Sequence, residues 1–362
     1  MPGSTLVRAA FFTAGAIIGG GVATVISSKS RSTVPPLRPT PVVSDTPIIE
    51  LDQAGRAKLQ ENALVPSNAV PSSILKYGNP GPISDTLVRQ AYVAAYDRRL
   101  RHPAWTAEHL TQASLKPSKG SNEGGDRSKS NFVEDESVPT PFRARLKDYF
   151  RSGYDRGHMV PAADAKFSQA AMNETFLLSN IAPQVGDGFN RHYWAYLEDW
   201  CRRLAGSFQD VYVFTVPLYL PRQDGDGKWR VTHEVIGSPP NVSVPTHFAK
   251  VVLTTKPVSP SNPDVLDIST GAFILPNAII PDEVPLERFV VPGLFGIAYP
   301  SVAYHLIIIV VDAVERAAGL TFFSDDIKAH SNHICKSTKC EVIVRRFDDA
   351  RKQGQKAIAA PK

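Results

Sequence analysis

The sequence predicts a globular protein of mixed α and β structure, on three observations. Of its 362 residues 43% are hydrophobic, which suits a chain with a buried core. It contains 30 prolines and 24 glycines, more than a helical bundle tolerates, because both residue types weaken or break helices. Several runs are rich in β-branched and aromatic residues, and one long stretch has helical periodicity. We therefore expect many short strands, long loops and one prominent helix.

The first 44 residues have the composition of a targeting segment. They hold four basic residues and no acid, and residues 9–26 form an uncharged run of about one bilayer's length. A basic, acid-free leader favours a mitochondrial presequence, whose apolar run could also act as an anchor in the inner membrane. A secreted or simply membrane-tethered protein is the alternative. Residues 45–82 continue as a proline-rich spacer.

The formal net charge of +5 does not by itself indicate a nucleic-acid-binding protein. Eight basic residues lie in segments 1–44 and 350–362, which hold no acid, so the rest of the chain has 32 basic and 35 acidic residues. Residues 349–362 thus form a basic tail. A polyanion bound by the body of the chain would need a local basic patch and a bound cation.

Strand-like runs follow one another through the body. Residues 90–97 and 103–110 flank a charged turn and predict a hairpin, and residues 116–131 read as a polar loop. Further strands are expected at 211–220, 230–237, 247–255, 271–275 and 341–347.

The segment that begins at Asn190 predicts the long helix. Asn190, Trp194, Leu197, Glu198 and Cys201 recur at intervals that place them on one face, which is apolar except for the amide and the carboxylate. Buried polar groups need partners, so these two could share a metal ion or its water shell. The alternative is that the asparagine caps the helix and the glutamate meets an arginine.

Residues 155–158 read Asp-Arg-Gly-His. The glycine permits close approach of the backbone, and the arginine can bind a phosphate bidentately. Imidazole is a base near neutral pH, so the tetrapeptide suits attack of water on a phosphodiester. A lone histidine is more often structural or exposed, so the motif alone does not establish a catalytic site.

Both motifs lie within a longer resemblance. The stretch from Tyr154 to Glu198, and the later segments VFTVPLYLPR, VIGSPPNVSVPTHFAK and CKSTKCEVIVRRF, resemble the DNA/RNA non-specific endonuclease family, and within it the endonuclease G-like enzymes of fungal mitochondria. The resemblance covers most of residues 73–348. It implies an α+β fold of the ββα-metal (His-Me finger) type, with a central antiparallel sheet flanked by helices, and a nuclease domain at 83–348.

The resemblance also implies roles for single residues. It places the general base at His158 and the metal ligand at Asn190, with Glu198 near the water shell of the metal and Arg156 as the arginine of the motif. Polar residues expected to support this site are Asp155, Asn180 and Gln184, and candidates for phosphate contact are Arg127 and Lys129.

The resemblance further implies Mg²⁺, or else Mn²⁺, as cofactor, and DNA and RNA as substrates cut to 5′-phosphate and 3′-hydroxyl ends. It implies a homodimer in the mitochondrial intermembrane space or inner membrane, where residues 9–26 would allow membrane association. Two other functions stay open: a nucleic-acid-binding protein whose inherited site is idle, and a membrane-proximal phosphodiesterase.

The three cysteines are too few for a four-thiolate zinc site. In an oxidising compartment Cys335 and Cys340 could form a disulfide, whereas Cys201 fits a core position.

An uncharged apolar run at 293–310 is atypical of a surface loop, because it would be an aggregation hazard in water. Pro300 and His305 near its middle disfavour a membrane span. We treat it as an insertion, either specific to the lineage or foreign to the fold, such as a translated intron.

Overall fold

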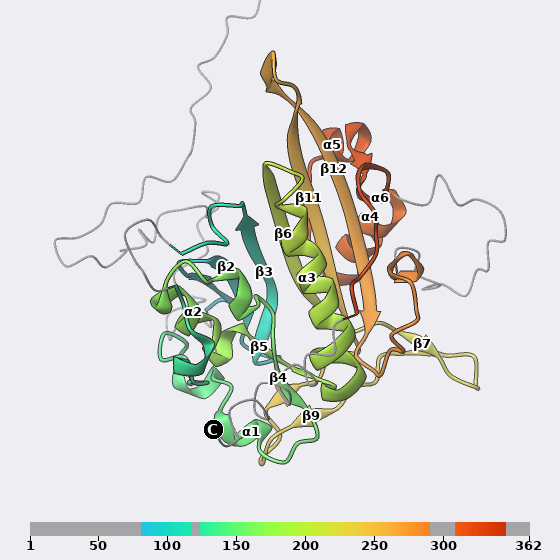
Figure 1. Cartoon of the computed structure of the whole chain (residues 1–362). Coiled ribbons are helices and arrows are strands. Elements are labelled where there is room, and N and C mark those ends of the chain that lie inside the picture. Colours follow the sequence, from blue (N-terminus) through green and yellow to red (C-terminus); the bar gives the residue numbers. More distant parts are fainter. Residues whose placement is uncertain (1–80, 118–123, 290–307, 345–362) are drawn as a thin grey trace, which may run out of the picture. The chain divides into compact units, whose positions relative to one another are not determined.

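A computed structural model describes residues 81–117, 124–289 and 308–344, and of residues 308–310 only the backbone (Figure 1). All of these belong to one compact unit, Asn79–Lys362. The leader, the basic tail and residues 293–307 of the apolar run lie outside the described residues. The last three residues of that run form the first turn of α4 (Ile308–Ala318). No helix within the described ranges is long and apolar enough to cross a membrane.

A seven-stranded sheet forms the centre of this unit. Its strands, in spatial order, are β1 (Ser84–Val88), β2 (Tyr92–Asp97), β3 (His102–Leu110), β6 (Asp210–Leu218), β11 (His247–Ser259), β12 (Asn262–Pro276) and β13 (Asn332–His333). Neighbouring strands pair antiparallel, except that β12 and β13 are parallel. The sheet confirms the predicted α+β class and the hairpin predicted from 90–97 and 103–110.

Short elements complete the described chain. Three two-stranded pairs combine β4 (Asp155–His158) with β5 (Ile181–Gln184), β7 (Arg222–Gln223) with β8 (Trp229–Arg230), and β9 (Val235–Ile236) with β10 (Val242–Ser243). The other α-helices are α1 (Leu146–Tyr149), α2 (Gln169–Thr175), α3 (Trp194–Leu204), α5 (Asp325–His330) and α6 (Ile334–Ser337). Single turns of 3-10 helix are η1 (Arg127–Lys129), η2 (Thr140–Phe142), η3 (Ala162–Asp164), η4 (Leu178–Asn180) and η6 (Leu286–Phe289), and η5 (Gly186–Tyr193) is a π-helix.

Two strand predictions were wrong over the described residues. The run 230–237 is not one strand, because residues 231–234 are exposed and make no strand pairing between β8 and β9. Residues 341–344 are irregular, and the rest of the predicted strand 341–347 lies outside the described residues. The predicted strand 271–275 is only the buried end of β12, which continues to Asn262 as an exposed arm paired with β11.

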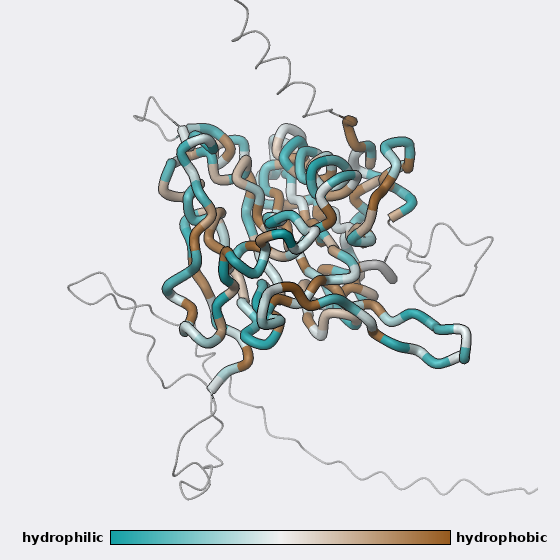
Figure 2. The backbone as a smooth tube through the Cα atoms, turned by 90° about the horizontal axis from the view of Figure 1, so that it is seen from below, coloured by the Kyte–Doolittle hydropathy of each residue, from teal (hydrophilic) through white to brown (hydrophobic). Residues whose placement is uncertain are grey.

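The long helix packs its predicted apolar face onto the sheet. Figure 1 shows α3 in front of β6 and β11, with α4, α5 and α6 beyond β12. The Trp194 ring lies 5.6 Å from that of Phe248, and the Trp200 ring meets Phe273 edge-on at 5.1 Å. Burial of such large side chains contributes roughly 1.5–3 kcal/mol each. Cys201 is buried and free among them, as expected. The β7–β8 hairpin differs from this buried core, because it projects from the unit and most of its residues are hydrophilic. It is seen at the right of Figure 2.

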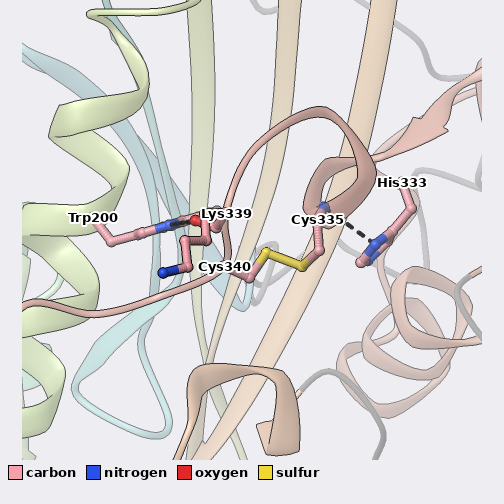
Figure 3. Close-up of a disulfide and its surroundings, with 5 residues drawn as sticks. All are labelled: Trp200, His333, Cys335, Lys339 and Cys340. Atoms are coloured by element: carbon pink, nitrogen blue, oxygen red, sulfur yellow. Dashed lines mark hydrogen bonds between the residues drawn. A yellow bond between two sulfur atoms is a disulfide. The ribbon is translucent and has the colours of Figure 1, made fainter.

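The C-terminal part of the described chain is joined to α3 by two hydrogen bonds and is closed by a disulfide. Cys335 and Cys340 form a disulfide with a Cα–Cα distance of 5.2 Å, which resolves the possibility left open by the sequence (Figure 3). The Trp200 indole donates to the carbonyl of Lys339 at 3.0 Å, and Arg203 donates to the carbonyl of Glu341 at 3.1 Å. This segment therefore fixes the helix that carries Glu198.

Candidate active site

A cleft of about 690 Å³ brings together residues from several elements of the described chain. Of the side chains predicted from the sequence, those that line it are Arg127, Asp155, Arg156, His158, Asn190 and Glu198. Asn180 and Gln184 are fully buried behind it, and Lys129 lies outside its lining. Charged side chains that are far apart in the sequence, from Arg127 to Glu198, thus line the same cleft.

The strand pair β4–β5 places His158 at the cleft. In this pair Gly157 faces Ala182 and His158 faces Ile181. A Cβ on Gly157 would lie 2.2 Å from the side chain of Gln184, so only glycine fits without movement. The amide of Gln184 makes no hydrogen bond within the described residues. Its contact with β4 at Gly157 is therefore one of packing.

The segment after His158 is held by the predicted Asn180. Its amide nitrogen donates to the carbonyls of Val160 and Thr175 at 3.0 and 2.8 Å, and its oxygen accepts from the Val160 amide at 3.1 Å. The Met159 amide donates to the Asn180 carbonyl at 2.9 Å. A buried amide with this many partners fixes the backbone that orients the imidazole.

The His158 ring is buried against two phenylalanines. It is 8% exposed and meets Phe176 edge-on at 4.7 Å and Phe132 at 5.4 Å. The guanidinium of Arg156 lies 4.3 Å from the centre of the Phe132 ring, and that of Arg127 lies 5.3 Å from Phe176. Burial, then these two arginines, lower the pKa of His158 to about 3. The imidazole is therefore neutral, and its buried Nε2 has no hydrogen-bond partner in the described chain.

Asn190 is not a helix cap, which corrects one alternative. It lies inside η5, before α3 begins, and its Nδ2 donates to Asp155 at 2.9 Å. A carboxylate can only accept, so the amide nitrogen must face Asp155 and the amide oxygen is directed elsewhere. Arg191 also binds Asp155, at 3.1 Å. The aspartate thus orients an amide oxygen that can coordinate a cation.

Glu198 lies two turns further along this face and is partly buried. Burial raises its pKa to about 7, opposed by the charges of Lys250 and Arg202. It forms no salt bridge within the described part of the chain, so the alternative in which Glu198 pairs with an arginine is not observed. The nearby Arg202 instead binds Asp164 at 2.8 Å.

Three arginines in the cleft lining were not predicted as site residues: Arg151, Arg191 and Arg202. The spacing of these arginines in the sequence follows no helical or strand period. They lie in separate parts of the chain and come close together only when the chain folds. With Arg127 and Arg156 they supply the basic patch that the net charge could not reveal.

Asn190 and Glu198 fit a hydrated divalent cation. Amide and carboxylate oxygens are the ligands that Mg²⁺ prefers, and an ion bound through one amide would keep most of its water. Within the described ranges there is no group of three or more His, Cys, Asp or Glu side chains that could hold a metal ion.

Comparisons with known proteins agree with this geometry. Residues 70–326 match the DNA/RNA non-specific endonuclease family. The chain is 46% identical over 307 residues to "Nuclease 1, mitochondrial" of Schizosaccharomyces pombe, which covers 85% of each chain. It is 39% identical over 249 residues to human "Endonuclease G, mitochondrial", covering 69% of this chain and 72% of that protein.

A solved structure gives the same result. The structure of the EndoG/EndoGI complex contains a chain 41% identical to this one, with a TM-score of 0.56, and the match covers 69% of this chain and 90% of that chain. Family, relatives and fold agree: the chain belongs to the DNA/RNA non-specific endonuclease family and is a nuclease of the ββα-metal fold.

Proposed function

We propose that this nuclease hydrolyses phosphodiester bonds in both DNA and RNA with little sequence preference, using His158 as general base and a divalent cation, Mg²⁺ or Mn²⁺, bound at Asn190. The observation that carries this proposal is a neutral, buried imidazole whose Nε2 has no partner within the described residues, in a cleft lined by arginines.

His158 accepts a proton from the attacking water. Its depressed pKa means that a proton does not occupy the ring before the reaction. Arg127 and Arg156 contribute to that depression. A bound phosphate would offset both positive charges and raise the pKa of His158 towards its ordinary value, so the base becomes stronger when substrate is present.

Asn190 would hold the cation and Glu198 its water. When bound, the ion supplies stabilisation of the charge that gathers on the phosphorus centre and the departing 3′ oxygen. Asp155 fixes the amide through its 2.9 Å hydrogen bond. The products are expected to carry 5′-phosphate and 3′-hydroxyl ends.

The arginines favour a polymeric substrate. Arg127, Arg151, Arg156, Arg191 and Arg202 all line the cleft. Contacts to phosphates position a nucleic acid but read no bases, so preference for sequence should be slight. A protein that only binds nucleic acid would not need a neutral imidazole whose Nε2 is free to accept a proton. An enzyme that acts on a small phosphodiester would not need five arginine side chains in its cleft.

We also propose a mitochondrial location, in the intermembrane space or inner membrane, with 83–348 as the nuclease domain. The leader-like residues 1–44 and the relatives named as mitochondrial nucleases support this. Homodimer formation rests on the family resemblance, and membrane association rests on the uncharged apolar run at residues 9–26.

The test is His158→Ala, assayed on plasmid, single-stranded RNA and a simple diester, with Mg²⁺ and then with EDTA. Loss of a general base should lower cleavage of both nucleic acids by about 10² to 10⁴ while the protein stays folded at the assay temperature, as followed by its melting curve. His330→Ala, at a side chain 78% exposed on α5, is the matched control.

Near-wild-type nicking by His158→Ala would exclude this base. Cleavage of the simple diester alone would favour the phosphodiesterase, and tight binding without any cleavage would favour the idle protein.

A further inference from the structure

An exposed aromatic ring lies at the cleft beside the phosphate-binding arginines. Phe150 follows α1 directly and is 72% exposed, yet it lines the same cleft as His158. Exposure of a whole phenylalanine ring to water is unfavourable, and burial of this ring within the described chain is small. The ring therefore offers a large apolar face to whatever enters the cleft.

The next residue places a cation on this ring at a conformational cost. Arg151 has φ of 55°, in the left-handed region that a non-glycine residue rarely adopts. Its guanidinium lies 5.1 Å from the centre of the Phe150 ring and also lines the cleft. Glycine would adopt this backbone freely, whereas an arginine here carries local strain, and such strain is concentrated at functional sites.

The loop that carries this pair is tied at both ends. Tyr149 is buried in a small apolar cluster with Ile181 of β5. The Ser152 hydroxyl lies 3.0 Å from the Tyr149 carbonyl and accepts from the Tyr154 amide at 3.2 Å. Tyr154 leads directly into β4, so the backbone that carries Phe150 is held in place relative to Arg156 and His158.

We propose that Phe150 and Arg151 form a stacking subsite for one unpaired nucleobase, next to the phosphate-binding part of the cleft. This inference rests on the proposed nuclease function. An aromatic ring stacks on any base, and a neighbouring arginine adds a second planar surface and a positive charge for the backbone. Every base has a π face, so the subsite is compatible with slight sequence preference.

The subsite predicts a substrate class. Bases of a duplex are stacked on their neighbours, and one must be unstacked before it can reach a protein ring. Single strands and unpaired segments present such bases without that cost. The pair therefore selects single-stranded RNA and DNA over intact duplex, whereas the arginines bind both.

The first experiment compares Phe150→Ala, Phe150→Trp and the control Trp229→Ala by steady-state cleavage of a single strand and of a duplex of the same sequence. Trp229 is 52% exposed on β8 and does not line the cleft. Loss of one stacked base should raise KM for the single strand roughly tenfold, with KM for the duplex changed less than about twofold. Tryptophan should restore the single-strand value.

The second experiment separates stacking from a structural effect. Binding of single strands with one abasic site, moved along the strand, is measured with the His158→Ala protein and with its Phe150→Ala derivative. At one position of the abasic site, removal of the base and removal of the Phe150 ring should each weaken binding by the same factor. Removal of both should weaken binding no further than removal of either one.

The proposed subsite would be overturned if Phe150→Ala raised KM equally for single strand and duplex, or raised neither. It would also be overturned if the effects of the abasic site and of Phe150→Ala on binding were additive at every position of the abasic site. A changed association state of Phe150→Ala would also overturn it, since the ring would then cover a protein surface. If the wild-type protein cleaves no nucleic acid, the nuclease proposal falls, and the binding experiment still decides whether the ring stacks on a base.

Discussion

Alanine in place of Gly157 tests whether packing behind the base controls catalysis. The new Cβ would lie 2.2 Å from Cδ and Oε1 of Gln184 and 2.4 Å from its Cγ. Close-packed atoms do not tolerate this, so one group has to move by about 1 Å. Overpacking of this kind costs about 1–3 kcal/mol. Displacement of the adjacent His158 by a similar distance should lower the cleavage rate about 10²-fold.

The assay is a double-mutant cycle with Gln184→Ala, which removes the three atoms nearest the new Cβ. Plasmid nicking rates and free energies of unfolding in urea are measured for both single variants and the double variant. The double variant should be faster and more stable than Gly157→Ala alone, with a coupling of about 1 kcal/mol or more. Gly225→Ala is the control, because a Cβ there meets nothing within 4 Å.

Wild-type rate and stability in Gly157→Ala would refute this reasoning. Strict additivity in the cycle would show that Gln184 is not the group that excludes a side chain from residue 157.

Three further predictions address the metal ligand, the disulfide and the buried histidine. Asn190→Ala should slow cleavage and raise the Mg²⁺ concentration for half-maximal rate, measured by metal titration; a loss of about 1 kcal/mol in stability with unchanged metal dependence would mark a purely structural residue. Replacement of Cys335 and Cys340 by serine should lower the free energy of unfolding by about 2 kcal/mol in urea, and an unchanged midpoint would contradict a constraint on the unfolded chain. The pKa of His158 is about 3 in the folded protein and 6.5 in the unfolded chain. Between these two pH values the unfolded chain therefore binds a proton that the folded protein does not bind. The free energy of unfolding should fall as the pH drops from 6.5 towards 3. That fall, followed by urea midpoints, should be shallower in His158→Ala, and parallel curves for the two proteins would disprove the assignment.

The sequence predicted the elements whose buried side chains are apolar and closely spaced. The face from Trp194 to Cys201 follows from helical periodicity, and the hairpin of β2 and β3 follows from two apolar and aromatic runs on either side of a charged turn. The outer arm of β12 has no such pattern, because residues 262–266 are exposed and are ordered by backbone pairing with β11. A strand of that kind cannot be found without its partner.

The site was predicted in part for the same reason. The motif and the helix face indicated His158 and Asn190, and the fold brings both to one cleft. Periodicity could not show that Asn190 lies in a π-helical turn, after Gly188 with φ of 72°. Nor could it show that Asp155 orients the amide, since that contact joins residues 35 positions apart.

The residues proposed for catalysis and metal binding all lie between Asp155 and Leu204, in β4, β5, η5 and α3. The strands that build most of the sheet, β6, β11 and β12, come later in the chain and reach the cleft mainly through the surface on which α3 rests. A change after residue 204 can therefore affect this chemistry mainly by moving the helix, either through the strands beneath α3 or through the segment that is hydrogen-bonded to Trp200 and Arg203. The proposed catalytic and metal-binding groups thus occupy one contiguous segment of the chain, and the later part of the domain serves to hold that segment in place.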